Sequence, residues 1–139
     1  MNASFTHFDH TADLGVRVCA PDMPGLAAAA IDSLYATIGN IATLEPAEHR
    51  RFEAVGEEPV LMLRDLLADL LVEFESASRI LTQPAVEAFD AGQLVVSGML
   101  RTVDHDRSEF SREVKAITYH DLALREIPGG CEFVYIVDI

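Results

Sequence analysis

Apolar and polar residues alternate with a period of two over residues 13–20, which is typical of a half-buried β-strand. After this strand the period lengthens to that of a helix. Asp22 is placed to cap the helix N-terminus, and a broad apolar stripe continues to about Ile38. Gly39 and Asn40 both tolerate the left-handed conformation, so we expect them to end the helix as a C-cap.

A second strand and a second helix are predicted in the middle of the chain. Residues 50–55 show a weak alternation that predicts a short strand. Leucines recur at intervals of three and four over residues 58–76, which is the strongest helical pattern in the chain, and Pro59 suits a first-turn position. The opposite face of this helix is acidic. We interpret it as a solvated surface, with a contact to a partner as the alternative.

From residue 79 onward the period is again two. The predicted strands are residues 79–89, 93–103, 113–126 and 131–138. The turn Asp90-Ala91-Gly92 predicts that the first two form a hairpin, and a charged loop over residues 104–112 separates the two pairs. The order βαβα followed by four strands predicts one α+β domain over residues 1–139, with two helices packed on one face of a mostly antiparallel β-sheet.

Composition and charge narrow the function. The 139 residues are 50% hydrophobic, which suits one domain with a substantial core. Its 23 acidic residues against 10 Lys and Arg give a net charge of -13. A protein that binds RNA or DNA through phosphate contacts needs a basic face, so direct nucleic-acid binding is not expected. An acidic surface suits a metal ion, a basic peptide or a basic protein partner.

Membrane, secretion and common enzyme motifs are not indicated. No apolar run approaches the roughly 20 residues of a membrane span, and the N-terminal residues lack a signal-peptide pattern. Cys19 and Cys131 lie far apart without a CxxC motif, which fits two reduced thiols. We therefore expect a cytoplasmic protein without membrane contact. The sequence also contains no GxSxG, P-loop or dinucleotide-binding glycine pattern, so no motif demands an enzyme.

The end of the chain is the most informative place for site chemistry. The last predicted strand stays apolar almost to its final residue, which should hold the Asp138 carboxylate beside the terminal carboxylate of Ile139. Two adjacent carboxylates repel and need a cation or a proton. A third carboxylate, such as Asp13, would complete a hard-oxygen site of the kind that Ca²⁺ or Mg²⁺ prefers. From the pattern alone, an Asp138 that ends the strand in water is the simpler interpretation.

Histidines supply the other candidate groups. His10 and His120 could be bases, metal ligands or hydrogen-bonded structural histidines, and the structural role is the commonest. No Cys/His spacing in the chain fits a tetrahedral zinc site.

Three segments carry a resemblance to a known family. The segments HTADLG (residues 10–15) and EVKAITYH (residues 113–120) resemble the two signature segments of the archease family. The ending VDI (residues 137–139) is similar to that family's short acidic-then-aliphatic terminus. The resemblance extends over the whole chain, including the Ala-rich first helix and the Leu-rich second helix. The second helix departs from the family pattern because it lacks a Trp.

The resemblance implies a protein cofactor of an RtcB-type RNA ligase in tRNA splicing and RNA repair. Such a protein promotes guanylylation of the ligase, allows multiple turnover and broadens nucleotide use, so it is an activator and not an enzyme. The resemblance also implies a divalent-metal site, with calcium as the expected ion, formed by Asp13, Asp138 and Ile139.

The resemblance further directs attention to His10, Lys115 and His120 as a surface that contacts the ligase. A chaperone or general protein-interaction module is the alternative function. A small metal-dependent hydrolase, with His10 as the base beside Asp13, is a third interpretation.

Overall fold

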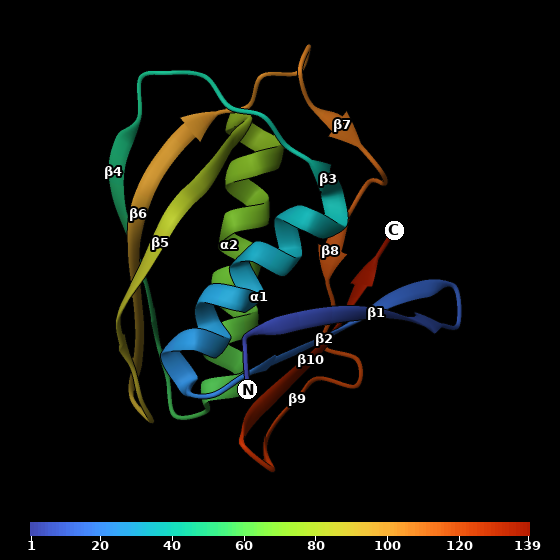
Figure 1. Ribbon diagram of the computed structural model, residues 1–139, viewed down its shortest axis with the longest axis vertical. Coiled ribbons are helices and arrows are strands. Elements are labelled where there is room, and N and C mark those ends of the chain that lie inside the picture. The colour runs from blue at the N-terminus through green and yellow to red at the C-terminus, as the bar shows by residue number, and fades with distance from the viewer.

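Two helices lie between two antiparallel β-sheets in the structure, a computed structural model that describes residues 1–139 (Figure 1). The helices are α1 (Met23–Ile38) and α2 (Pro59–Ala77). The strands are β1 (Ser4–His10), β2 (Asp13–Ala20), β3 (Gly39–Asn40), β4 (Glu48–Val55), β5 (Arg79–Phe89), β6 (Gln93–Thr102), β7 (Glu109–Phe110), β8 (Ala116–Ile117), β9 (Ala123–Ile127) and β10 (Gly130–Asp138). The predicted α+β class is confirmed. The division of the strands between two main sheets is not evident in the sequence pattern.

Strand β10 is the central strand of the larger, five-stranded sheet. On one side it pairs antiparallel with β2, which in turn pairs with β1 at the edge. On its other side β9 pairs with the first half of β10 and β8 pairs with its end. Both edges of β10 are therefore covered, and Asp138 occupies a sheet position instead of a frayed tail.

The second main sheet has three strands in the order β4-β6-β5. The predicted hairpin is confirmed as β5 and β6, and the Asp90 carboxylate accepts hydrogen bonds from the backbone N–H groups of Gly92 and Gln93 in its turn. Both helices contact both main sheets, and one core of 29 buried residues joins the layers. Neither helix combines the length and apolar character needed to cross a membrane.

Two buried tyrosine hydroxyls link helix α1 to the two main sheets, one to each sheet. The Ser33 and Tyr135 hydroxyls are 2.6 Å apart, which links α1 to β10. The Tyr35 hydroxyl accepts a hydrogen bond from the Leu81 N–H at 2.9 Å, which links α1 to β5. Burial raises the pKa of both tyrosines well above the usual range, so both stay neutral. The predicted N-cap of α1 is also present, because the Asp22 carboxylate accepts from the Gly25 N–H at 2.8 Å.

The C-terminal end of α1 differs from the prediction. Gly39 has φ 161° and ψ -163°, which is extended and not left-handed, and with Asn40 it forms β3. Strand β3 pairs with β7, which lies in the segment predicted as a loop. A Cβ atom on Gly39 would lie 2.2 Å from the Glu109 carbonyl oxygen. The glycine is therefore used for close backbone approach and not for a left-handed cap.

We expect Gly39→Ala to destabilise the protein by roughly 1–3 kcal/mol, because the new methyl group must push β7 away from β3. Urea denaturation of the variant measures this loss. Gly56→Ala is the matched control, since a Cβ there would meet only the Met62 side chain at 3.5 Å. Equal stability of the two variants would contradict the steric explanation.

The predicted strand over residues 113–126 is wrong as a continuous element. Only β8 and β9 are strands, and a polar turn separates them. In this turn the Thr118 hydroxyl accepts a hydrogen bond from the His120 N–H at 3.2 Å, and Asp121 adopts a left-handed φ of 50°. Side chains that bond to nearby backbone compete with strand pairing. The edge strand β1 is absent from the predicted elements, because most of its residues are exposed and its apolar pattern is weak.

Candidate functional site

Strand β2 begins and β10 ends at the same corner of the larger sheet. The last pair in their register joins Leu14 to Val137, and continuing this register by one step places Asp13 opposite Asp138 at the ends of the two strands. Directly opposite residues of antiparallel strands point to the same side, with Cβ atoms about 4.5–5.5 Å apart. The sheet register thus places two of the predicted metal ligands at neighbouring strand ends, with Ile139 as the next residue.

His10 lies beside these aspartates because the tight turn between β1 and β2 pairs it with Asp13. The His10 Nδ1 atom is 3.9 Å from Asp13 Oδ2, which is too long for a hydrogen bond. On the other side of the ring, Nε2 is 3.0 Å from Asp121 Oδ2. Nδ1 is buried and has no hydrogen-bond partner. His10 therefore stands between two carboxylates with one ring nitrogen unsatisfied.

His120 and Asp121 reach His10 from the turn between β8 and β9. The rings of His10 and His120 meet edge to face, with centroids 4.9 Å apart. His120 Nε2 is 3.4 Å from Asp121 Oδ2, and the ligating atoms of the three residues all lie within 4.8 Å of one another. Both histidines are among the residues predicted from the sequence, but Asp121 is not. Because 111 residues separate Asp121 from His10, no local spacing could have connected them.

Lys115 is the remaining predicted residue of this surface. Its backbone N–H donates to the Asp138 carbonyl at 2.7 Å, which places it one strand away from Asp13. Lys115 is the only lysine in the chain, and its exposed side chain has no carboxylate partner. By contrast, every arginine except Arg112 has an acidic partner, and Arg112 donates to the Thr37 carbonyl. We call the corner with Asp13 and Asp138 the acidic corner. Lys115 is the cation beside it that has no acidic partner.

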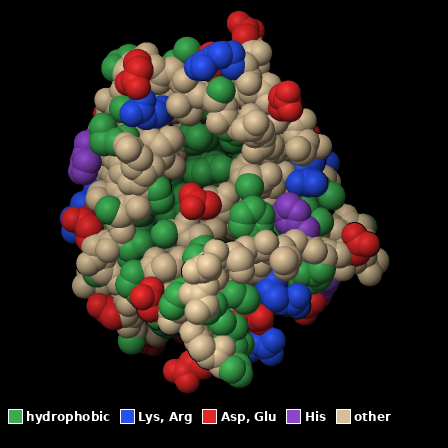
Figure 2. Space-filling view, in the orientation of Figure 1, with side chains coloured by type: hydrophobic (Ala, Val, Ile, Leu, Met, Phe, Trp, Pro, Cys, Tyr) green, Lys and Arg blue, Asp and Glu red, His purple; other side chains and the backbone are tan.

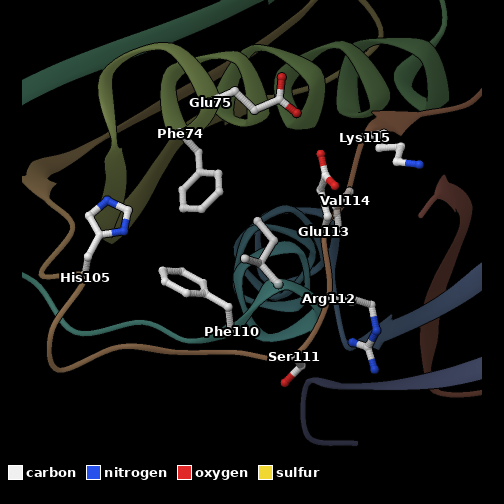
Figure 3. Close-up of a pocket in the computed structure, with 10 residues that line it drawn as sticks. Phe74, Glu75, His105, Phe110, Ser111, Arg112, Glu113, Val114 and Lys115 are labelled. Atoms are coloured by element: carbon white, nitrogen blue, oxygen red, sulfur yellow. The ribbon is translucent and has the colours of Figure 1, made fainter.

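A cavity of about 910 Å³ adjoins Lys115 between the end of α2 and the segment 110–115 (Figure 3). Phe74 and Phe110 face each other across it with ring centroids 6.3 Å apart. The ring of His105 is 5.7 Å from that of Phe110. Lys115 lies at the opposite end from His105 and points away from the aromatic rings (Figure 3). The loop histidine His105 thus belongs to this cavity and not to the acidic corner.

The two cysteines take no part in the corner. Both are free thiols. Burial is the main cause that raises the pKa of each, and the Glu132 carboxylate raises that of Cys19 further. A raised pKa reduces the thiolate fraction at neutral pH, which makes both thiols weak nucleophiles.

The fold and the corner together define a class of protein: a small α+β domain whose conspicuous polar groups lie at the ends of paired strands in a sheet. The chain matches the protein-family model described as "Archease protein family (MTH1598/TM1083)" over residues 5–139. The protein belongs to the archease family.

Similar proteins span almost the same length. The archease of Methanopyrus kandleri is 31% identical, with 94% of this chain and 96% of that protein covered. The archease of Pyrococcus abyssi is 30% identical, with 89% of each covered. Protein 1598 of Methanobacterium thermoautotrophicum, solved in solution, is 26% identical with a TM-score of 0.74, covering 97% of this chain and 98% of that one. A Thermotoga maritima archease, described as a possible chaperone, has the same fold at 21% identity, with a TM-score of 0.70 and coverage of 95% and 94%.

Proposed function

We propose that this protein activates an RtcB-type RNA ligase, promoting its guanylylation and multiple turnover and broadening its nucleotide use in tRNA splicing and RNA repair. One observation carries the proposal: in this member of the archease family, Asp13 and Asp138 lie at neighbouring strand ends, and Lys115, whose side chain has no carboxylate partner, is bonded to the Asp138 backbone. Asp138 and Lys115 are exposed at the end of the sheet, where a second protein can reach them.

The charge of the protein supports a ligase as partner. An enzyme that holds RNA needs a basic surface for the phosphates, and a domain with a net charge of -13 is attracted to such a surface. Acidic side chains are spread singly over the face seen in Figure 2 and do not form one block. The attraction therefore acts at long range and speeds encounter, while the corner supplies the specific contact. RNA competes for the same basic surface, so the complex is transient.

We further infer that Asp13, Asp138 and a main-chain oxygen of Ile139 hold a divalent cation, with calcium as the expected ion. The arrangement fits, because two aspartates that face each other across paired strands repel unless a cation lies between them. An all-oxygen ligand set favours a hard cation over a transition metal. When bound, the ion would supply positive charge to share with oxygen atoms of the partner or its nucleotide.

Each residue in and around the acidic corner has its own task in this proposal. Asp13 and Asp138 shape the acidic side of the contact. Lys115, one strand away, provides a point charge for an acidic group of the ligase, and the exposed His120 side chain adds a second contact. His10 is half-buried, is paired with Asp13 in the β1–β2 turn and contacts Asp121, so it lies behind the surface that meets the ligase.

A ligation assay tests the function. A matched RNA ligase is used in limiting amount, with and without this protein, and both ligated RNA and guanylylated ligase are quantified. We expect about one turnover per ligase without the protein and many with it. No increase in either quantity would sink the activator proposal and favour the chaperone alternative.

The aromatic cavity is the observation that favours the chaperone alternative, because Phe110 is 46% exposed beside Phe74. A chaperone needs exposed apolar surface for its clients. Light scattering of an aggregating client protein, with and without this domain, distinguishes the two functions. Suppressed aggregation together with unchanged ligation would select the chaperone.

Lys115→Ala is expected to raise the concentration of the protein needed for half-maximal ligase activation, by roughly tenfold for one lost charge-assisted contact. The fold should be unaffected, since the Lys115 side chain is exposed and unpaired. Lys115→Arg is the matched control and should retain most of the activation. If Lys115→Ala activates like the wild type, the corner does not contact the ligase through this residue.

A further inference from the structure

We propose that His10, His120 and Asp121 form a second metal site, which takes a transition metal of the Zn²⁺ class and is distinct from the all-oxygen site at Asp13 and Asp138. The three residues come from the β1–β2 turn and the β8–β9 turn, which the larger sheet brings together. Metal binding is measured on the isolated protein, so the site can be tested independently of the ligase role.

Two of the three distances between ligand atoms are close to those of a tetrahedral centre. Zinc binds nitrogen and oxygen at about 2.0–2.1 Å, so neighbouring ligand atoms of a tetrahedral site lie roughly 3.3 Å apart. The Asp121 Oδ2 atom is 3.0 Å from His10 Nε2 and 3.4 Å from His120 Nε2. The ligand atoms of the two histidines lie within 4.8 Å of each other. The His120 side chain is 64% exposed, so it has room to rotate toward the ion.

The unsatisfied ring nitrogen of His10 is an independent sign of a ligand. In the neutral ring, an Nε2 that donates to Asp121 leaves a lone pair on Nδ1, which then faces the Asp13 carboxylate at 3.9 Å. That arrangement buries an acceptor without a donor. A metal on Nε2 requires the proton to be on Nδ1, where it points toward Asp13. A histidine that binds metal through one nitrogen and faces a carboxylate with the other is the usual pairing in zinc proteins.

The ligand chemistry selects the kind of metal. Two imidazoles and one carboxylate suit Zn²⁺ and related ions, whereas Ca²⁺ and Mg²⁺ prefer oxygen ligands. Asp121 is 62% exposed, so the fourth position is open to water or to a partner's side chain. His10 is also close to Asp13, so the two proposed metal sites are next to each other.

The test is a titration of the metal-free full chain with Zn²⁺, and with Co²⁺ as a spectroscopic probe, followed by calorimetry and by the imidazole ¹⁵N resonances. The variants are His120→Ala and Asp121→Asn. Asparagine tolerates the left-handed conformation of residue 121, so the turn is preserved. His49→Ala is the matched control, because His49 is an exposed histidine on β4. Asp138→Asn removes a ligand of the all-oxygen site only, so it shows to which of the two sites a metal binds.

We expect one Zn²⁺ per chain, Nε2 resonances of His10 and His120 that respond to the metal, and tetrahedral Co²⁺ absorption. His120→Ala and Asp121→Asn should each weaken Zn²⁺ binding by more than about tenfold, while His49→Ala and Asp138→Asn retain it. Conversely, Asp138→Asn should lose Ca²⁺ binding and His120→Ala should keep it. Wild-type protein that binds no Zn²⁺, or Zn²⁺ binding that is lost in Asp138→Asn but kept in His120→Ala, would overturn the proposal.

Discussion

Replacing Asp13 by alanine is expected to abolish ligase activation and to leave the fold intact. The Asp13 side chain is 27% exposed and makes no hydrogen bond, since its nearest polar neighbour, His10 Nδ1, is 3.9 Å away, so the fold does not depend on it. Its removal leaves Asp138 alone at the corner and relieves the repulsion between the two carboxylates. Without metal, the variant should therefore be at least as stable as the wild type. Turnovers of a limiting RNA ligase measure the loss of activation.

Thermal unfolding with and without Ca²⁺ separates the metal effect from the partner effect. A ligand that binds only the folded state raises the melting temperature, so the wild type should gain stability with Ca²⁺ and Asp13→Ala should not. Asp9→Ala is the matched control, since Asp9 is an exposed aspartate on the neighbouring strand β1. Full ligase activation by Asp13→Ala would remove the acidic corner from the mechanism.

Phe133→Ala is expected to destabilise the protein more than Gly39→Ala does, by about 3–5 kcal/mol. Phe133 is fully buried in the middle of β10 and stacks on Tyr135 with ring centroids 5.2 Å apart. The lost ring leaves a cavity in the core that β10 shares with the helices. Since small domains are stable by only about 5–15 kcal/mol, the loss is a large fraction of the total. Urea denaturation monitored by circular dichroism measures it.

Phe110→Ala provides the comparison, because Phe110 is 46% exposed at the cavity beside α2. Its removal should cost less than about 1 kcal/mol. A Phe133→Ala variant as stable as Phe110→Ala would show that core packing of the Phe133 ring does not hold β10 in place.

Elements with a strong local pattern were predictable. Helix α1 was found from its Asp22 cap and apolar stripe, and α2 from its leucine spacing, because the buried face of a helix repeats within a few residues. Strand β1 and the two-residue strand β7 were missed because they are exposed and gain their pairing from distant partners. The role of Gly39 was mistaken for the same reason: the atom that excludes a side chain there belongs to residue 109.

The residues of the candidate site also divide into those that the sequence indicates and those that only the fold brings together. The apolar last strand indicated Asp138 and Ile139, with Asp13 as a candidate third carboxylate, and the resemblance then implied all three as metal ligands. The β2–β10 register, continued by one step, places the two aspartates opposite each other. Their binding of a metal stays a prediction. Asp121 could not be found, since its contact with His10 depends on the left-handed turn that interrupts the predicted strand over residues 113–126. Sequence periodicity records which face of an element is buried and carries no information about which turns meet.

The central position of β10 determines which parts of the protein can fold during its synthesis. A ribosome releases β1, β2, both helices and the β5–β6 hairpin before residues 130–138 emerge, yet β2, β8 and β9 all pair with that last strand. Nascent chains can form the β4-β6-β5 sheet early, whereas the larger sheet must wait. Asp138 arrives with the strand that completes this sheet. A chain interrupted before residue 130 therefore lacks the closed sheet and the acidic corner together, so a half-built site is not displayed on a finished fold.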